Sequence, residues 1–321
     1  MPKPLNTLLV YARPSIALKL EGLQKLLAAA EGLPVDLWWH SSLSEILTEV
    51  FPDLIPQFFD SENPCPEPIK SKKDQALVLT LGGDGTLLDG VQFAVEWNLP
   101  VFGFHLGRLG FLSSAGGTED FPMALSAILN GDIEIEKRSL VACRYPKAPE
   151  RQGPIDPKSS NNLHSSTESS GFAFALNEIA LHRQGAGLMC ITCYVDGEIL
   201  NHYQADGLLI STPTGSTAYS MSCGGPIILP RSRVLLITPV AGHQLGIRPI
   251  LLPDNCKLQL TTALEGGHCQ LMLDGKTMEW NGYGVLEVHR YDKTLALARL
   301  NGFSDFQPLK NKLLWGLDMR G

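Results

Sequence analysis

Long apolar runs and excess positive charge are missing from this 321-residue chain. No stretch of about 18 apolar residues occurs, and residues 1–7 lack the apolar run of a signal peptide, so we expect no membrane association and a cytoplasmic location. The net charge of −7 gives no general field for attracting a phosphate backbone, which argues against a nucleic-acid partner. Any anionic ligand must therefore be held by local donors.

Cysteine is also scarce, and its pattern excludes two kinds of site. The chain has seven cysteines, an odd number, and is too large to need a disulfide framework, so reduced thiols packed in the core are expected. Cys190 and Cys193 form a single CxxC pair, whereas a zinc ribbon needs two such pairs. We therefore assign no protein-held metal site and interpret both cysteines as core residues.

Two kinds of pattern follow one another along the chain. Residues 1–134 alternate short apolar strands with helical patterns, which predicts a parallel sheet with helices on its faces. Strand patterns dominate afterwards, and residues 135–295 are expected to form a β-rich domain. A chain of 321 residues also exceeds the size at which one hydrophobic core usually stops growing. The expected fold class is α/β plus all-β.

Local signals are strong at a few places. Residues 76–81 are predicted to form a buried strand that enters a glycine-rich turn and then a helix. Asp-Gly pairs at 196–197 and 274–275 separate alternating apolar segments, which is typical of β-hairpins. Residues 146–171 are rich in Pro, Ser, Asn and charge, which predicts a mobile surface insertion.

The glycine-rich turn is the most informative motif, and it consists of Gly82, Gly83, Asp84, Gly85 and Thr86. Glycines let the backbone bend tightly and bring N–H groups close to phosphate oxygens, and the helix start adds partial positive charge. A carboxylate would repel phosphates, so Asp84 is expected to take a proton or to coordinate a metal ion. The alternative is a structural turn in which Asp84 caps the helix.

Better-known phosphate loops are missing. No G-x-G-x-x-G occurs, and Gly275-Lys276-Thr277 does not complete a Walker A loop because position 270 is Gln rather than Gly. The turn at residues 82–86 therefore has to be interpreted by its own chemistry.

A second polar cluster follows an apolar strand pattern. Residues 211–219 contain five hydroxyl side chains, one Gly and Tyr219. Short hydroxyls and free N–H groups can bond ribose, phosphate or an adenine edge, while the tyrosine ring can lie against a base. The alternative is an ordinary loop in which Ser216 or Thr217 is a helix N-cap.

Asn177 and Glu178 lie inside an otherwise apolar run, residues 172–181. Burying two polar side chains in a strand costs stability unless each is hydrogen-bonded. A ligand hydroxyl or base edge is one possible partner, and the chain's own backbone is the other.

In this order along the chain, residues 82–86, Asn177-Glu178, Asp206-Gly207 and residues 212–219 resemble the NAD kinase family. The resemblance covers roughly residues 76–290 and includes 107–112 and 238–249. The Gly-Gly-Asp-Gly-Thr element is shared with diacylglycerol and sphingosine-type lipid kinases. The Thr-Pro-Thr-Gly-Ser-Thr-Ala-Tyr element separates the family from them.

The resemblance implies a Rossmann-like N-terminal domain (1–134), a β-sandwich-like NAD-binding domain (135–295) with the active site between them, and a C-terminal segment (296–321) that folds back onto the first. It also implies phosphorylation of the adenosine-ribose 2′-hydroxyl of NAD by ATP to give NADP, with Mg²⁺ or another divalent cation, in a homo-oligomer (dimer or tetramer).

By the same resemblance, Asp84 looks like the catalytic base. The residues implied to bind the phosphates of ATP are Gly82, Gly83, Gly85 and Thr86. Those implied to bind NAD are Gly85, Asn177, Glu178, Asp206, Thr217, Ala218, Tyr219 and Ser222.

Four positions bear on the finer contacts. His105 stands where an Asn is common and is expected to be a core histidine, Gly242 where a Pro is common, and Lys276 where a Gln is common. Gln204 occupies a position that helps some members choose NAD over NADH, and the sequence leaves both acceptors open. Use of polyphosphate as donor is likewise left open.

Two other functions are compatible with parts of the pattern. A lipid kinase would share the glycine-rich turn, but the acidic composition disfavours binding to anionic membranes. A non-catalytic NAD(P)-binding protein would use the same pocket, but binding alone gives no reason to place the Asp84 carboxylate near phosphates.

Overall fold

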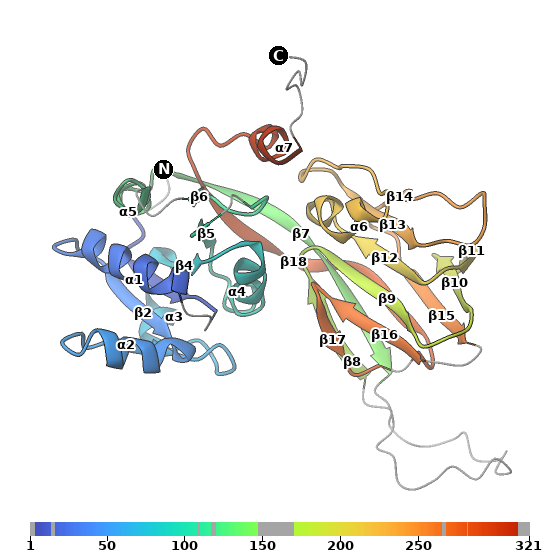
Figure 1. The fold of residues 1–321 in the computed structure, drawn as a ribbon, viewed down its shortest axis with the longest axis horizontal. Helices are drawn as coiled ribbons and strands as arrows, with labels where there is room; N and C mark the ends of the chain where they lie inside the picture. The colour runs from blue at the N-terminus through green and yellow to red at the C-terminus, as the bar shows by residue number, and fades with distance from the viewer. Residues whose placement is uncertain are drawn as a thin grey trace, which may run out of the picture. The chain divides into compact units, whose positions relative to one another are not determined.

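The computed structural model describes residues 4–13, 17–107, 110–116, 120–146, 170–264, 268–280 and 282–313 (Figure 1). The chain divides into two compact units, Met1–Arg138 with Lys293–Gly321, and Ser139–Asp292. It passes from one unit to the other within strands β7 (Ile133–Pro146) and β18 (Leu286–Leu300). The three-part division at 134 and 295 stays a prediction.

The first unit is built on a parallel sheet. Its strands lie in the order β3-β2-β1-β4-β5-β18, and all these neighbours pair in parallel. The predicted α/β alternation is thereby confirmed. Its elements, besides β7 and β18, are β1 (Thr7–Tyr11), α1 (Ala17–Ala30), β2 (Asp36–His40), η1 (Ser41–Leu43), α2 (Ser44–Val50), β3 (Gln57–Phe59), α3 (Glu67–Ser71), η2 (Lys73–Gln75), β4 (Ala76–Leu81), α4 (Asp84–Trp97), β5 (Val101–His105), β6 (Ala115–Gly116), α5 (Phe121–Asn130) and α7 (Phe306–Leu313).

Strand β4 is central in this sheet, and its sequence explains why. All six of its residues are buried, as expected for a parallel strand covered on both faces. Helix α4 ends at Trp97, and its C-cap Asn98 takes the left-handed conformation with φ 56°, a common helix terminator. Phe104 on β5 stacks on Phe121 of α5 with ring centroids 3.8 Å apart. Each such fully buried side chain contributes about 1.5–3 kcal/mol.

The parallel register brings two chain segments to one edge of the sheet. Tyr11 of β1 pairs with Thr80 of β4, so both strands end at the same edge. Ligands of open α/β sheets bind beyond these carboxyl ends. The glycine-rich turn after β4 therefore lies where a nucleotide is expected.

The second unit is all-antiparallel. One of its sheets has the order β11-β10-β15-β18, the other the order β14-β13-β12-β9-β16-β17, and β7 pairs with β8. Its further elements are β8 (Ser170–Ala175), β9 (Glu178–Gln184), β10 (Met189–Val195), β11 (Glu198–Gln204), β12 (Gly207–Ser211), η4 (Thr214–Thr217), α6 (Tyr219–Ser222), β13 (Val234–Val240), β14 (Ile250–Pro253), β15 (Leu258–Leu264), β16 (His268–Leu273) and β17 (Lys276–Met278).

Both sheets contribute to one hydrophobic core in this unit. Ile191 and Leu258 come from the first sheet, and Ile210 and Leu271 from the second. Such two-sheet packing is what the α/β plus all-β prediction required, and that fold class is confirmed. Cys193 is buried in this core, as predicted, whereas Cys190 is only partly covered.

Both predicted hairpins are present. Asp196 and Gly197 join β10 to β11 with φ values of 49° and 89°, and Asp274 and Gly275 join β16 to β17 with 47° and 80°. Positive φ at both central residues is the signature of the turn that Asp-Gly favours.

Two further expectations concern the periphery. Nearly all of the predicted insertion, residues 147–169, lies outside the described residues. None of the described helices is both long and apolar enough to cross a membrane.

Candidate active site

The turn from β4 into α4 depends on glycine. Gly82 has φ +154°, and a Cβ there would overlap Thr86 Oγ1. Gly83 is the N-cap of α4, and its carbonyl accepts the N–H of Thr86 at 2.9 Å and that of Leu87 at 3.3 Å. The N–H groups of Asp84 and Gly85 precede these first helical bonds and so have no partner within the helix. The helix start therefore offers donors suited to phosphate oxygens.

Asp84 is the first residue of α4, yet its carboxylate does not cap the helix. Oδ2 accepts the N–H of Phe111 at 2.8 Å, and Oδ1 accepts that of Leu112 at 3.2 Å. The helix-cap alternative is therefore wrong, because the carboxylate reaches to another loop of the same unit. Its side chain stays 29% exposed, so a ligand can reach it.

Gly110 makes room for this carboxylate, and its substitution gives a sharp prediction. A Cβ at Gly110 would overlap Asp84 Oδ1, whereas one at Gly107 would meet nothing within 4 Å. Gly110→Ala is expected to displace the carboxylate and to lower kcat by about 10²-fold, the cost of a misplacement near 1 Å. Gly107→Ala, in the same segment, should keep wild-type kcat. Equal kcat values for the two variants in a steady-state assay would contradict this account.

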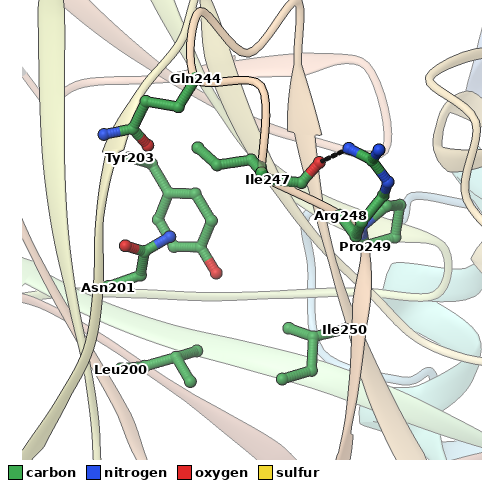
Figure 2. A pocket seen from close by; sticks show the side chains of 9 residues that line it. Leu200, Asn201, Tyr203, Gln244, Ile247, Arg248, Pro249 and Ile250 are labelled. Carbon is green, nitrogen blue, oxygen red and sulfur yellow. Dashed lines mark hydrogen bonds between the residues drawn. The ribbon is translucent and has the colours of Figure 1, made fainter.

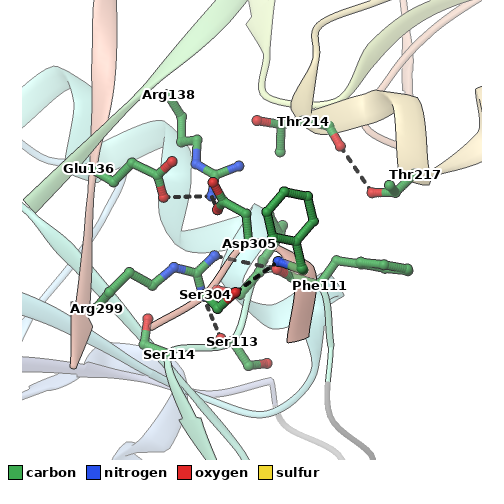
Figure 3. Close-up of polar contacts among 12 residues, drawn as sticks. Phe111, Ser113, Ser114, Glu136, Arg138, Thr214, Thr217, Arg299, Ser304 and Asp305 are labelled. Atoms are coloured by element: carbon green, nitrogen blue, oxygen red, sulfur yellow. Dashed lines mark hydrogen bonds and ion pairs between the residues drawn. The ribbon is translucent and has the colours of Figure 1, made fainter. Parts of the chain in front are cut away.

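Arg299 on β18 anchors the loop at residues 111–113, and Figure 3 shows it beside Phe111 and Ser113. The same loop anchors Asp84. The Arg299 guanidinium donates to the carbonyls of Leu112 at 2.9 Å, Phe111 at 3.3 Å and Ser113. Arg299 is 2% exposed, and burial lowers its pKa to about 10, with Arg138 adding to the shift. It remains charged at neutral pH, and charge-assisted bonds of this kind are the strong ones.

Arg299 and its charged neighbours were not predicted from the sequence. Arg138 is buried and pairs with Glu136 at 2.6 Å and with Asp305 at 3.8 Å (Figure 3). The available signal was a charged residue within an apolar strand pattern, since Arg299 follows residues 295–298 of β18. Such a residue needs a buried partner.

Arg13, which follows β1, lies beside the same turn. Its Nη2 donates to the carbonyl of Gly85 at 3.0 Å, and its Nε donates to Asp89 at 2.5 Å. Tyr11 donates to the same carboxylate, and burial followed by the charge of Asp89 raises its pKa to about 12. This basic residue was also not predicted.

In the second unit, Asp274 organises the backbone of the polar pair Asn177-Glu178. Its Oδ1 accepts the N–H groups of Asn177 at 2.7 Å and Glu178 at 3.1 Å, and its Oδ2 accepts that of Leu176 at 2.7 Å. Thr212 also bonds this segment, with its N–H donating to the Asn177 carbonyl at 2.9 Å. The sequence left open whether groups of the protein bond this pair. They do, and they bond the backbone of Asn177 and Glu178.

The Glu178 side chain differs from its backbone in its hydrogen bonding. It is 7% exposed, and within the described part of the chain its Oε2 is buried without a hydrogen-bond partner. Burial first, and the charge of Asp274 second, raise its pKa to about 8. Burial raises the pKa of Asp274 to about 6 against the opposing effect of its three N–H donors. Because those donors favour the ionised form, Asp274 carries the charge and Glu178 the proton at neutral pH.

This protonation makes stability depend on pH. The unfolded chain releases the Glu178 proton near the ordinary value of 4.5, while the folded chain keeps it to about 8. The stabilisation is therefore complete below 4.5 and is lost as pH rises towards 8. Glu178→Gln should reduce the fall in unfolding free energy between pH 5 and 8, measured by urea denaturation. Glu198→Gln, at an exposed position of β11, should leave the wild-type slope; an unchanged slope in both variants would refute the assignment.

Some hydroxyl side chains of the loop at residues 211–219 are hydrogen-bonded to the protein backbone. Ser216 is buried, donates to the Pro213 carbonyl at 2.7 Å and accepts the N–H of Ile228 at 2.9 Å. Thr217 donates to the Thr214 carbonyl at 3.2 Å. Neither is an N-cap, because the caps of η4 and α6 are Pro213 and Ala218. The N-cap alternative is therefore wrong.

The accessible part of this loop contains four of the residues implied to bind NAD. Thr217 and Ala218 are partly exposed, and Tyr219 and Ser222 are exposed. The Tyr219 ring stacks on His182 of β9 with centroids 5.4 Å apart and planes at 22°. Burial raises the pKa of Tyr219, to which Cys223 and Glu178 also contribute.

The Asp206 carboxylate forms an ion pair with Arg183 of the same unit. Arg183 donates to its Oδ1 from Nη2 at 2.8 Å and from Nε at 3.2 Å, and His243 Nε2 lies 3.7 Å away. The hydrogen bond from Arg183 is the main cause that lowers the pKa of Asp206. Arg183 was not predicted, although its position beside His182 on β9 was a signal of a polar strand end.

His105 is a core histidine, as predicted. It is 9% exposed, its Nδ1 lies 2.9 Å from the Gly107 carbonyl, and a Cβ at Gly116 would overlap its ring. Lys276 is exposed in the β16–β17 hairpin and helps to lower the pKa of Asp274.

A cavity of about 670 Å³ in the second unit is lined by residues other than the predicted ones (Figure 2). Tyr203 of β11 lies on one side, and Ile247 and Arg248 lie on the other. The Arg248 guanidinium is bonded to the carbonyls of Leu245 at 3.0 Å and Ile247 at 2.7 Å. None of these residues was predicted from the sequence to bind a ligand.

The chain matches known proteins over most of its length. The ATP-NAD kinase N-terminal domain matches residues 68–133, and the ATP-NAD kinase C-terminal domain matches residues 176–300. The NAD kinase of Cytophaga hutchinsonii is 35% identical over 245 residues, which are 76% of this chain and 77% of that protein. The NAD kinase of Gemmatimonas aurantiaca is 36% identical over 244 residues, which are 74% and 77%.

Two solved structures share the fold. Yeast NADH kinase complexed with NADH aligns with a TM-score of 0.78 and 24% identity, covering 99% of this chain and 90% of that one. An NAD kinase from Archaeoglobus fulgidus in complex with ATP aligns with a TM-score of 0.65 and 21% identity, covering 96% and 98%.

Fold and comparisons together define a nucleotide-dependent phosphotransferase, with a parallel α/β unit and an antiparallel β unit. The matches to both kinase domains identify the family. Relatives about one-third identical over three quarters of the chain support the same assignment. The chain belongs to the ATP-NAD kinase family. The lipid-kinase and non-catalytic alternatives are therefore set aside.

Proposed function

We propose that this protein transfers the γ-phosphoryl group of ATP to the 2′-hydroxyl of the adenosine ribose of NAD, which gives NADP and ADP. The observation that carries the proposal is the Asp84 carboxylate, anchored by two backbone N–H groups beside a glycine-rich helix start. A carboxylate held so firmly next to phosphate donors serves as the base for an incoming hydroxyl.

In the first unit, the ATP phosphates bind the turn of Gly82, Gly83, Gly85 and Thr86. Support comes from the N–H groups at the start of α4 and from the close packing of Gly82 on Thr86. Asp84 accepts the hydroxyl proton while the 2′-oxygen attacks the γ-phosphorus in line with the leaving ADP oxygen. Because the transition state is loose, the base orients the hydroxyl as much as it removes the proton.

In the second unit, Asn177, Glu178, Thr217, Ala218, Tyr219 and Ser222 bind the adenosine half of NAD, together with Gly85 of the turn. Support comes from the unpartnered Oε2 of Glu178 and from the exposed ring of Tyr219. Asp206 contacts the other nucleoside half, and its bonds to Arg183 fix the orientation of its carboxylate.

The divalent cation of the reaction arrives with ATP. Within the described ranges, no group of three or more His, Cys, Asp or Glu side chains is arranged to hold a metal ion. Mg²⁺ is commonly bound through substrate phosphates, so the ATP phosphates would hold the cation, and the cation would neutralise part of their charge. Homo-oligomerisation and a cytoplasmic location stay predictions.

The test is direct. Purified protein is incubated with ATP, Mg²⁺ and NAD, and NADP is detected with an NADP-specific dehydrogenase. NADP formation that requires both ATP and the cation supports the proposal. Its absence with NAD and with NADH would refute it. The same assay with polyphosphate in place of ATP defines the donor.

A further inference from the structure

The end of helix α7 places a lysine beside the proposed base. Lys312 Nζ lies 3.9 Å from Asp84 Oδ2 and 4.4 Å from the centre of the Phe111 ring. The Lys312 side chain is 32% exposed and that of Asp84 is 29% exposed. Three segments of the first unit, around residues 84, 111 and 312, thus meet at one carboxylate.

The geometry is not that of a closed ion pair. A direct N–H···O bond measures about 2.7–3.2 Å, and the Nζ–Oδ2 separation is longer. Both carboxylate oxygens already accept a backbone N–H, from Phe111 and from Leu112. The face of the Phe111 ring attracts the ammonium and holds it in place. Within the described part of the chain, the three donors of Lys312 are therefore open to a further acceptor next to Asp84.

A phosphate oxygen is the hydrogen-bond acceptor that best suits the Lys312 ammonium at this position. A phosphoryl group attacked by a hydroxyl at Asp84 must pass close to the carboxylate, and the two negative charges repel one another. Among the described residues, Arg13 beside the turn is bonded to Asp89 and to the Gly85 carbonyl, and Arg299 is bonded to the carbonyls of Phe111 and Leu112. With a net charge of −7 the chain supplies no general positive field, so an ammonium beside Asp84 adds to the charge of the divalent cation in offsetting the repulsion.

We infer that Lys312 is a further catalytic residue, whose ammonium contacts a non-bridging oxygen of the phosphoryl group during its transfer. The inference rests on the proposed role of Asp84. In the step, the bond from the ribose 2′-oxygen to the γ-phosphorus forms and the bond from that phosphorus to the ADP oxygen breaks. The hydroxyl proton goes to Asp84. The Lys312 ammonium donates to the phosphoryl oxygens and stabilises the charge on them.

The test compares Lys312→Met, Lys312→Arg and Lys310→Met in the full-length protein. Lys310 is an exposed lysine of the same helix and is the matched control. Lys312→Met should lower kcat by about 10²-fold, as removal of one donor to a developing charge does, with the KM for NAD within about threefold. Lys312→Arg should recover part of the loss, and Lys310→Met should match the wild type. Urea denaturation of each variant checks that it is folded.

The outcomes separate two failures. A wild-type protein that forms no NADP defeats the proposed function itself. A wild-type protein that forms NADP, together with a folded Lys312→Met variant that keeps kcat within threefold, overturns the role of Lys312 alone. A raised KM for NAD at unchanged kcat would also overturn it, because it would place the lysine on the acceptor rather than on the phosphoryl group.

Discussion

Asp84→Asn is expected to lower kcat by about 10²- to 10⁴-fold, the usual contribution of a general base, while NAD still binds. The amide cannot take the hydroxyl proton, but its carbonyl oxygen can still accept one of the two N–H groups that hold the carboxylate now. NADP formation gives kcat, and titration with NAD gives the affinity. The two measurements separate chemistry from binding.

Asp132→Asn serves as the control for this variant. Asp132 is an exposed aspartate of the same unit, so its change removes one negative charge without touching the turn. It should keep wild-type kcat. If Asp84→Asn also turned over at close to the wild-type rate, Asp84 would be no more than an anchor for the loop at residues 110–112.

Asp274→Ala is expected to be the most destabilising of these changes. It leaves the N–H groups of Leu176, Asn177 and Glu178 without their acceptor. These three residues are buried, and each buried donor left unpaired costs about 1–3 kcal/mol. We expect the free energy of unfolding to fall by about 3 kcal/mol or more, measured by urea denaturation. The KM for NAD should rise as well, because Asn177 and Glu178 lose their fixed backbone.

Asp196→Ala is a matched control for this change. Asp196 occupies the same place in the other Asp-Gly hairpin, with φ 49° against 47° for Asp274. Both substitutions place alanine at a positive φ, so that strain cancels in the comparison. Among the described residues, Asp196 accepts a single N–H, that of Lys257, at 2.9 Å in an exposed setting. Similar losses of stability in the two variants would show that Asp274 stabilises the protein through the turn and not through its three buried hydrogen bonds.

Features set by adjacent residues could be predicted from the sequence. The glycine-rich turn follows a six-residue apolar strand, and the structure has β4 at Ala76–Leu81 as predicted. The two hairpins follow from Asp-Gly pairs, whose positive φ values are a property of two neighbouring residues. The switch from strand–helix alternation to strands alone fixed the fold class.

Contacts between distant residues could not be predicted. Arg299 bonds to the Leu112 carbonyl across 187 positions, and Asp274 bonds to Leu176 across 98. Asp274 was recognised only as a turn former, because its local pattern says nothing about which donors its carboxylate meets. Both cap alternatives failed for the same reason. Asp84 and Ser216 have side chains that can cap a helix, but tertiary partners use them elsewhere.

A structure of the protein with NAD and an unreactive ATP analogue tests the central claim most directly. The account predicts that a carboxylate oxygen of Asp84 lies within hydrogen-bonding reach, about 3.2 Å or less, of the adenosine-ribose 2′-oxygen. A complex in which that hydroxyl instead contacts another base, with Asp84 still bound only to the backbone of residues 111 and 112, would contradict it.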